Sequence, residues 1–455
     1  MNLPETPAAR LAVKIAATLH GHGFQAYLVG GCVRDLLLGV VPEDFDVATD
    51  AVPGRIIELF PRADLVGAHF GVVIVHDETA RVEVATFRSD HAYHDGRRPE
   101  SVRFETDPRE DVRRRDFTIN ALLLDVRHCR VIDHVGGRGD LAARLIRTVG
   151  DPETRFREDH LRMLRAVRLA ARLGFSIDPA AADALRRLRT LIHRVSVERV
   201  RDEVLRLLTE GGARRGFELL DGTGLLTEIL PEVAAMKGVP QPPQFHPEGD
   251  VWTHTLLMLE SMGRATPSLA LGVLLHDVGK PPTFRVAERI RFDGHPKLGA
   301  EMAAQILSRL RCANELRERV VSLVRDHLRF MHVRQMRAST LKRFLRAPHF
   351  HEHLELHRLD CLASHRMLAN YEFCRAKLDE LSEEDLRPPP LITGVDLIAA
   401  GYTPGPEFRR ILNAVETAQL ESKLHSPAEA IAFVRSRFVP PGGAPATGAV
   451  MPDDT

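Results

Sequence analysis

The stretch from Leu28 to Thr49, LVGGCVRDLLLGVVPEDFDVAT, constrains the fold of this chain more than any other. A short apolar run ends in the pair Gly30-Gly31, a helix-like segment follows, and Asp44 and Asp46 come next. Glycine lets a backbone approach a phosphate closely, and a helix that begins there offers free N–H groups to an anion. The order predicts a strand, a phosphate-compatible turn, a helix and a second strand.

The acidic pair predicts a metal site. In a strand, residues two apart such as Asp44 and Asp46 point to the same face. Mg²⁺ prefers one or two carboxylates plus substrate phosphate oxygens, and two such ions can clamp the attacking and leaving oxygens of a phosphoryl displacement. Glu83, in RVEVATFR, points away from the face of Val82 and Val84. It can either join the acidic cluster or face solvent on an edge strand.

Length and composition set the broad class. A chain of 455 residues predicts two to four domains. A net charge of zero with 27% charged residues makes any nucleic-acid surface local. Five scattered cysteines without a CxxC pair argue against a disulfide framework and a cysteine zinc site. No apolar run reaches the roughly 18 residues that span a bilayer, and the N-terminus lacks a signal-peptide core, so we expect a cytoplasmic protein without membrane contact.

The predicted secondary structure changes along the chain, from strands to helices. Valine-rich segments at 69–77, 81–88, 120–126 and 130–135 predict strands. The polar, turn-rich segment 89–107 predicts a mobile loop. From about residue 150 the chain becomes helical.

Two further segments mark boundaries in the helical part. QPPQFHPEGD, residues 241–250, is the clearest linker, and RPPPL, residues 387–391, is a second boundary. The Pro/Gly/Ala-rich end of the chain, PPGGAPATGAVMPDDT, predicts a disordered tail.

A second charged constellation is RRRDFTINA, residues 113–121. Three arginines beside Asp116 can meet a triphosphate, because guanidinium forks fit phosphate oxygens. The carboxylate can accept a hydrogen bond from a ribose hydroxyl. The alternative is a surface charge run.

The segment RFREDHLRMLRAVRLAARLGF, residues 155–175, predicts one helix capped by Gly174. Four arginines on a solvent-facing stripe would repel one another, and a polyanion or a triphosphate would relieve that repulsion. Asp159 and Arg162, one turn apart, offer a donor-and-acceptor edge that can hydrogen-bond a base. The stripe, spaced three or four residues apart, comprises Asp159, Arg162, Arg165, Arg168 and Arg172.

Together these motifs resemble those of class II tRNA nucleotidyltransferases, the CCA-adding enzymes and bacterial poly(A) polymerases of the polymerase-β-like superfamily, over about residues 24–235. The resemblance implies that Asp44 and Asp46 are catalytic and bind Mg²⁺. It implies that the incoming nucleotide is bound by Gly31, Arg34, Arg115, Asp116, Asp159, Arg162, Arg165 and Arg168.

The same resemblance assigns finer roles. Asp159 and Arg162 would act as an amino-acid template that selects CTP or ATP. VERVRDEV, residues 197–204, resembles a neck motif whose Glu198 and Arg199 are structural. The loop 89–104 would help to switch the pocket from CTP to ATP through a pattern that contains Tyr93, Asp95, Gly96, Arg97 and Arg98.

A separate histidine and aspartate set lies in residues 251–365. A lone histidine is usually structural, but an adjacent His-Asp pair before a Gly-Lys turn favours a metal site. Imidazole with carboxylate suits Zn, Mn, Fe, Co or Ni. The ordered set resembles the HD superfamily of metal-dependent phosphohydrolases, and it comprises His254, His276, Asp277, His295, His327 and Asp360. Its completeness implies an active centre, with phosphatase or 2′,3′-cyclic phosphodiesterase activity.

The resemblance implies an α+β protein. A polymerase-β-like nucleotidyltransferase head, a mixed sheet with helices, would precede an all-α neck and body and an all-α HD domain. The expected boundaries are 1–150 for the head, 151–240 for the neck and body, 246–385 for the HD domain, 386–438 for a helical tRNA-binding tail and 439–455 for a disordered tail.

The predicted function is template-independent addition of CCA to tRNA 3′ ends from CTP and ATP, with a second phosphohydrolase activity. Poly(A) synthesis and addition of only CC or only A stay open, as does a homodimer. A mainly hydrolytic protein whose front half binds RNA is another alternative. A non-enzymatic RNA-binding module has difficulty with the buried acids, which are costly without a metal.

Overall fold

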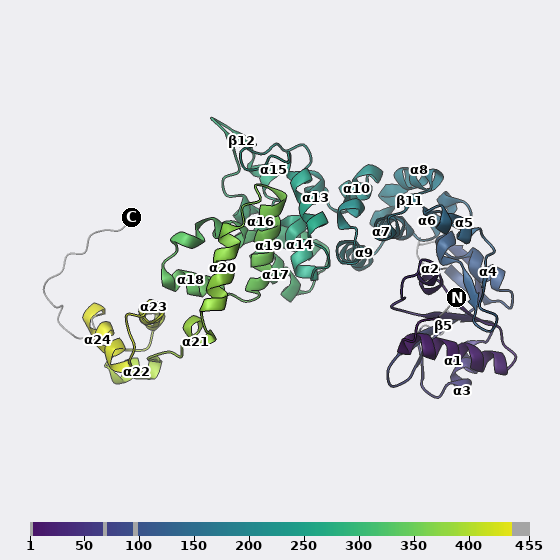
Figure 1. The fold of residues 1–455 in the computed structure, drawn as a ribbon, viewed down its shortest axis with the longest axis horizontal. Coiled ribbons are helices and arrows are strands. Elements are labelled where there is room, and N and C mark those ends of the chain that lie inside the picture. The colour runs from purple at the N-terminus through teal and green to yellow at the C-terminus, as the bar shows by residue number, and fades with distance from the viewer. Residues whose placement is uncertain (1–2, 67–70, 94–98, 439–455) are drawn as a thin grey trace.

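A computed structural model describes residues 3–66, 71–93 and 99–438 of the chain. The molecule is elongated: a head that contains the N-terminus lies at one end, helices fill the middle, and a small helical tail lies at the other end (Figure 1). The predicted α+β class is confirmed. Among the described residues, no helix is both long and apolar enough to cross a bilayer.

The head is built around a seven-stranded sheet in the order β3-β4-β5-β2-β1-β8-β9. Its central strands mix directions, because β1 pairs antiparallel with β2 and β8 while β2 pairs parallel with β5. The sheet strands are β1 (Ala26–Val29), β2 (Asp46–Thr49), β3 (Ala63–Leu65), β4 (Val72–His76), β5 (Arg81–Thr86), β8 (Leu123–Asp125) and β9 (Arg130–Ile132). All four predicted strand segments are therefore present. The helices of the head are α1 (Pro7–Gly21), α2 (Gly31–Leu37), α3 (Pro53–Leu59), α4 (Pro108–Arg113), η2 (Thr118–Asn120) and α5 (Gly137–Ala142).

Strand β1 is buried on both faces of the sheet. Its side chains point alternately to the two faces and contribute to two separate hydrophobic clusters. Ala26 and Leu28 belong to the cluster that α1 covers, whereas Tyr27 and Val29 belong to the cluster on the other face. This double burial holds the end of β1, and thus the glycine pair that follows it, in one position.

The prediction of a loop over 89–107 is wrong for the two strands that the structure describes there. β6 (Arg88–Tyr93) and β7 (Pro99–Phe104) form an antiparallel hairpin with Arg88 opposite Phe104. The segment is polar, and such strands lack the apolar alternation by which sequence patterns reveal a strand. Residues 94–98, which include Asp95, Gly96, Arg97 and Arg98 of the predicted switching loop, lie outside the described residues.

The neck and body continue from the head through a pair of two-residue strands, β10 (Leu145–Ile146) and β11 (Ser176–Ile177), which pair in parallel. The remaining elements are helices. They are α6 (Pro152–Glu158), α7 (Arg162–Leu173), α8 (Pro179–Leu188), η3 (Arg189–Arg194), α9 (Val197–Thr209), α10 (Ala213–Thr223), α11 (Leu225–Ile229) and α12 (Pro231–Ala234).

The single helix predicted over 155–175 is broken. Asp159 has extended backbone angles (φ −141°, ψ 106°), and α7 begins at Arg162. The Asp159 carboxylate accepts a hydrogen bond from the backbone N–H of Leu161 at 3.0 Å. A short polar side chain that bonds to nearby backbone competes with the helix, which explains the break. The predicted cap at Gly174, in the left-handed region, is confirmed.

The middle of the molecule is helical apart from the hairpin of β12 (Arg285–Val286) and β13 (Ile290–Arg291). Its helices are α13 (Val251–Ser261), α14 (Pro267–Leu275), α15 (Lys280–Thr283), α16 (His295–Arg309), α17 (Asn314–Asp326), η4 (His327–Gln335), α18 (Ala338–Leu345), α19 (Phe350–Ala363), α20 (Ala369–Glu380) and α21 (Glu383–Leu386). The tail consists of α22 (Gly394–Ala399), α23 (Pro406–Leu420) and α24 (Pro427–Arg437). The predicted disordered segment 439–455 lies outside the described residues.

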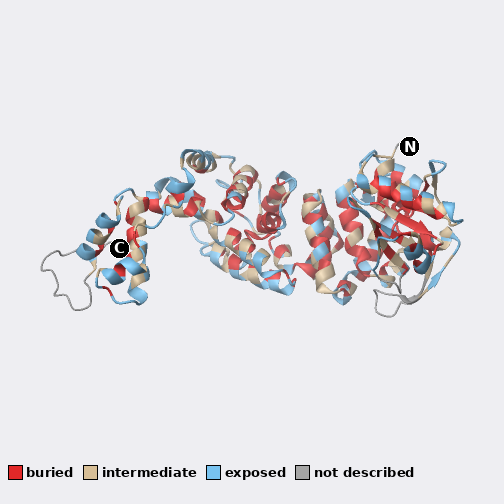
Figure 2. Ribbon diagram, turned by 90° about the horizontal axis from the view of Figure 1, so that it is seen from below, coloured by how far each residue is buried: buried red, intermediate tan, exposed pale blue. Residues whose placement is uncertain are grey.

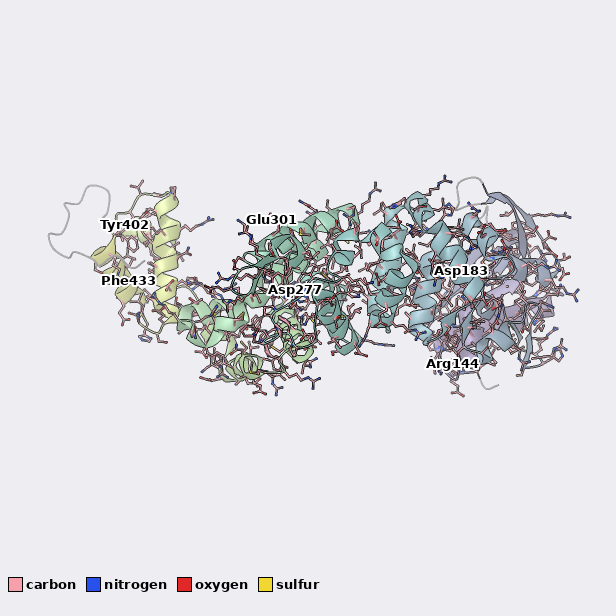
Figure 3. All side chains as sticks on the ribbon, turned by 90° about the horizontal axis from the view of Figure 1, so that it is seen from above. Arg144, Asp183, Asp277, Glu301, Tyr402 and Phe433 are labelled. Carbon is pink, nitrogen blue, oxygen red and sulfur yellow. The ribbon has the colours of Figure 1, made fainter. Side chains whose placement is uncertain are left out.

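One hydrophobic core runs from the neck into the middle of the molecule. It joins residues from Phe117 to Ala363, so the first helices after the predicted linker pack on the neck and body. Buried residues accordingly continue from neck to middle in Figure 2. The tail has its own small core, which includes Tyr402, and both Tyr402 and Phe433 are labelled in the tail in Figure 3.

Candidate functional sites

The first site forms where β1 ends beside the start of β2. Val29 pairs with Asp46, so Gly30 lies next to the Asp46 carboxylate. A Cβ on Gly30 would lie 3.5 Å from Asp46 Oδ2 and 3.7 Å from Arg115 Nη1, and Gly30 has φ +82°. The backbone angle favours glycine here, whereas a Cβ at these distances would be in ordinary van der Waals contact.

Three carboxylates gather at this point. Asp46 opens β2 and is the register partner of Glu83 on the neighbouring parallel strand β5. Asp44 precedes the strand and is exposed, and the buried Phe45 separates the two aspartates so that they lie on the same side. Burial, together with the nearby charges of Glu83 and Asp44, raises the pKa of Asp46 to about 6. Such mutual repulsion is what a bound divalent cation would relieve, so the three residues fit Mg²⁺.

An arginine-rich cavity of about 280 Å³ adjoins these carboxylates. Gly30 and Gly31 form part of its lining, together with Asp46 and Asp116. Arginines outnumber the acidic residues on its wall, so the cavity suits a polyphosphate. The arginines that line it are Arg34, Arg115, Arg165, Arg168, Arg172 and Arg206.

Asp116 lines this cavity and forms an ion pair with Arg165. Arg165 on α7 donates two hydrogen bonds to Asp116 Oδ2, at 2.9 Å from Nε and 2.6 Å from Nη2. Burial alone would raise the pKa of Asp116, but Arg165 outweighs it and holds the pKa at about 2. The charge of Asp116 raises the pKa of Arg165 in turn. Asp116 is therefore an ionised hydrogen-bond acceptor at neutral pH.

The arginines of α7 are paired with acidic side chains. The prediction that they repel one another on a solvent-facing stripe is therefore wrong. Arg168 Nε donates to Glu203 at 2.7 Å, and its Nη1 donates to Glu210 at 2.9 Å. Arg172 is 3.6 Å from Glu210. These acidic partners come from α9 and the residue after it, 35 and 42 residues along from Arg168. Helical spacing within 155–175 could not reveal them.

Asp159 and Arg162 lie beside the cavity, and each has a protein partner. The Asp159 carboxylate accepts hydrogen bonds from Arg199 at 2.8 and 3.2 Å. Arg162 donates to Glu158 at 2.6 Å and to the Arg114 carbonyl at 3.3 Å. Neither residue is among those that line the cavity. In this structure both side chains of the predicted base-reading edge are therefore already hydrogen-bonded within the protein.

Arg34 on α2 is also held in place. Its guanidinium is buried and donates to Asp35 at 2.7 Å and to Asn120 at 2.6 Å. Asn120 was not singled out from the sequence, although it lies within the RRRDFTINA segment. Its amide Nδ2 is 3.3 Å from Asp116 Oδ1, so it links the two predicted nucleotide contacts.

The second site lies in the middle of the molecule, where Figure 3 labels Asp277. Its six predicted residues come from five places in the chain, because His276 and Asp277 are neighbours in the turn after α14, and the other four meet there. One group of potential ligands joins His254, His276 and Asp360, with His254 Nε2 at 3.2 Å from Asp360 Oδ1. A second group joins Asp277, His295 and His327, with His295 Nε2 at 3.5 Å and His327 Nε2 at 3.8 Å from Asp277 Oδ1. Asp277 Oδ2 faces His276 at 3.1 Å, so Asp277 touches both groups. A third group, His246, Glu248 and His254, adjoins the first through His254.

The histidines present Nε2 to this centre. The Nδ1 atoms of His276, His295 and His327 lie 2.7 to 2.9 Å from backbone carbonyls three residues earlier. A carbonyl can only accept, so Nδ1 carries the proton and Nε2 is available as a ligand. Burial lowers the pKa of His295, and burial and His276 lower that of His327 to about 3. Both are neutral imidazoles, the form that a metal ligand requires.

The donor set fits a metal. The buried Nε2 of His276 makes no hydrogen bond within the described residues. His254 differs from His295 and His327: burial alone would lower its pKa, but its contacts with Asp360 and Glu248 raise it to about 9, so metal binding there would release the proton on Nε2. Burial alone would raise the pKa of Asp277, but the charges of His276 and Lys280 keep it well below its usual range. Carboxylates kept ionised among imidazole nitrogens suit a divalent transition metal.

Four of the six candidate metal ligands line a cavity of about 780 Å³, the HD cavity; they are Asp277, His295, His327 and Asp360. Its wall includes exposed Arg289 and Arg291 from the β12–β13 hairpin, Phe245 from the preceding loop, and buried Lys280. Cations and an aromatic ring beside a metal centre suit a phosphorylated substrate. The sequence had not singled out Phe245 or the hairpin arginines, because nothing in their local pattern marks a site.

Comparison with known families agrees with this layout. The family described as "Poly A polymerase head domain" matches residues 26–147, "Probable RNA and SrmB- binding site of polymerase A" matches 174–237, and "HD domain" matches 251–360. The fold and sites thus define a two-centre protein, with a nucleotidyltransferase head and an HD domain.

Individual relatives narrow the class. A CCA-adding enzyme of Lactobacillus gasseri is 39% identical over 271 residues, 59% of this chain and 67% of that enzyme. One from Bacillus pumilus is 44% identical over 229 residues, 50% of this chain and 56% of that enzyme. The chain thus spans little more than half the length of that relative. This chain belongs to the family of CCA-adding enzymes.

Solved structures extend the likeness over the whole fold. The crystal structure of the Bacillus stearothermophilus CCA-adding enzyme in complex with CTP has a TM-score of 0.73 and 28% identity, and it covers 95% of this chain and 98% of that one. The Thermotoga maritima CCA-adding enzyme complexed with tRNA has a TM-score of 0.59 at 19% identity, with 95% and 96% covered, and supports the fold.

Proposed function

We propose that this protein adds CCA to the 3′ ends of tRNA from CTP and ATP, in the cytoplasm and without a nucleic-acid template. The observation that carries the proposal is the arginine-lined cavity that meets Asp46 and Asp116 at its acidic end. Relatives named CCA-adding enzymes and a relative's complex with CTP support it.

The roles of individual residues follow from the geometry. Asp44 and Asp46, with Glu83 beside them, would hold Mg²⁺, which lowers the pKa of the attacking 3′-hydroxyl and neutralises charge on the leaving pyrophosphate. The arginines of the cavity bind the triphosphate. Gly30 and Gly31 let the backbone approach the phosphates, and Asp116, held by Arg165, accepts a hydrogen bond from the ribose.

Base selection is assigned to Asp159 and Arg162. Both lie beside the cavity and carry the donor and acceptor that a pyrimidine or purine edge requires. To read a base, Asp159 and Arg162 would use the acceptor and donor positions that their protein partners leave open. The predicted switch from CTP to ATP is assigned to the loop 89–104.

The test uses tRNA that ends at the discriminator base. The enzyme is incubated with CTP alone, with ATP alone and with both. We expect added C residues with CTP alone, little addition with ATP alone, and CCA with both. Long A tails with ATP alone would favour poly(A) polymerase, and ends that stop at CC or that gain only A would favour a specialised enzyme.

We propose a second activity for the middle of the chain, hydrolysis of a phosphoester at the HD centre. The two ligand groups that meet at Asp277 carry this proposal, because together they can hold two divalent ions such as Ni, Mn, Co, Fe or Zn. A bound metal would activate the attacking water. The chain's own residues supply the rest: Asp277 orients His276 and Lys280, and Arg289 and Arg291 draw in the phosphate.

The test is hydrolysis of p-nitrophenyl phosphate and of a 2′,3′-cyclic nucleotide after metal reconstitution. Asp277→Asn should abolish hydrolysis and metal uptake while nucleotidyl transfer persists. His351→Ala, an exposed histidine on the same domain, is the control and should behave as wild type. Hydrolysis that survives Asp277→Asn would contradict the assignment.

A further inference from the structure

The loop 240–250 reads as an interdomain linker in the sequence, yet the structure makes it a closed and ordered segment. Pro240 and Asp250 form an antiparallel bridge at its two ends. Asp250 also caps α13 by accepting from the Thr253 N–H at 2.8 Å, and it accepts from the Gly238 N–H at 2.6 Å. The ends of the loop are therefore fixed to the body on one side and to α13 on the other.

Two side chains of this loop contact the candidate metal ligands, Glu248 directly and Gln241 through Lys280. Glu248 Oε1 accepts hydrogen bonds from Nδ1 of His254 at 2.7 Å and from Nδ1 of His246 at 2.9 Å, and the Glu248 side chain is only 7% exposed. Gln241 Oε1 accepts from Nζ of Lys280 at 2.6 Å. Lys280 Nζ in turn lies 2.7 Å from Asp277 Oδ2.

His254 differs from the other three histidines in how its Nδ1 is held. His276, His295 and His327 lie at or beside helix ends and bond to backbone carbonyls three residues earlier. His254 lies within α13. Its Nδ1 donates to the buried carboxylate of Glu248 instead of to a backbone carbonyl.

We propose that Glu248 is a positioning residue for His254, and that the loop 240–250 is therefore part of the HD metal centre. The inference rests on the proposed metal site. Glu248 keeps the proton on Nδ1, turns Nε2 toward Asp360 and His276, and makes the imidazole a stronger ligand, as carboxylates beside metal-bound histidines generally do. Glu248 also accepts a hydrogen bond from His246, which lines the HD cavity. The same carboxylate therefore contacts both a candidate metal ligand, His254, and a residue of the cavity wall.

The test titrates metal-stripped full-length protein with Co²⁺ and follows the visible absorption that imidazole ligation produces. Removing an outer partner of a ligating histidine typically costs about 10- to 100-fold in metal affinity, so Glu248→Gln and Glu248→Ala should move the midpoint by that factor and change the band shape. Glu248→Gln is isosteric and keeps the test valid if the alanine variant fails to fold.

The matched control is Glu352→Gln. Glu352 is also a buried carboxylate of this domain and accepts from Thr266, Ser268 and Arg319. Its loss should lower the melting temperature but leave Co²⁺ affinity unchanged. A Glu248→Gln midpoint equal to that of wild type would overturn the inference. A wild type with no Co²⁺ band would instead overturn the metal centre on which it rests.

Discussion

Asp116 and Arg165, 49 residues apart in the chain, form a two-hydrogen-bond ion pair that joins the head to α7 of the neck. The pair places an ionised carboxylate and a guanidinium in the wall of one cavity. It also ties the geometry of the nucleotide site to the packing of the neck on the head.

This pair makes stability depend on acid in a defined window. The pKa of Asp116 falls from 3.8 to about 2 on folding. A lowered carboxyl pKa stabilises the folded state above the unfolded pKa, and that contribution disappears as the pH falls from about 4 toward 2. We expect the pair to contribute roughly 2 kcal/mol at neutral pH. Urea unfolding of wild type and Asp116→Asn should therefore show a gap in unfolding free energy that is constant above pH 5 and narrows below pH 4. A gap that widens in acid would contradict this assignment.

Gly30 and Gly39 provide a matched pair of substitutions. Both have positive φ, +82° and +74°, but only Gly30 has Asp46 and Arg115 within 4 Å of the position of a Cβ. Alanine at either position should cost about 1–2 kcal/mol of stability because of the left-handed backbone. Gly30→Ala should also reduce nucleotidyl transfer, because the methyl group would occupy part of the cavity that Gly30 lines, beside Asp46. Equal transfer rates for the two variants would show that the position of Gly30 in the cavity wall has no role.

Asp46→Asn should remove nucleotidyl transfer selectively. Loss of metal-based stabilisation of several kcal/mol corresponds to a rate decrease of about 10³-fold or more, and Asp44→Ala should act in the same direction. Phosphoester hydrolysis at the HD centre should be unchanged. Asp64→Asn, at a 71%-exposed carboxylate of the same sheet, is the control. A parallel loss of both activities in Asp46→Asn would contradict two independent sites.

Asp159→Ala should relax nucleotide choice. A good bidentate contact to a base is worth about 1–3 kcal/mol of discrimination, so we expect preference for CTP and ATP over UTP and GTP to fall by about 10- to 100-fold. Competition among the four nucleotides measures this. Arg157→Ala, an exposed neighbour in the same segment, is the control and should keep wild-type preference. Unchanged preference in Asp159→Ala would remove Asp159 from base selection.

Much of this architecture could be predicted from local patterns. The strand that ends before Gly30, the start of β2 at Asp46 and the turn between the His276-Asp277 pair and Lys280 depend on short-range spacing, and the structure contains all of them. Patterns of this kind report apolar periodicity, turn residues and caps, which act within a few residues.

The rest depends on partners far apart in the chain. Arg199 closes onto Asp159 from 40 residues away, and Glu203 neutralises Arg168 from 35 residues away. No local spacing encodes such pairs. Glu248 is closer in sequence to His254, but it lies in a proline-rich segment whose composition is typical of a linker, so its role became visible only when the loop was seen to close.

The most direct test of the account is to sequence the 3′ ends of a tRNA lacking CCA after incubation with CTP, ATP, Mg²⁺ and either wild type or Asp46→Asn. The account predicts ends completed to CCA with wild type and unextended ends with the variant. Oligo(A) ends or unextended tRNA with wild type, or CCA made equally well by Asp46→Asn, would contradict it.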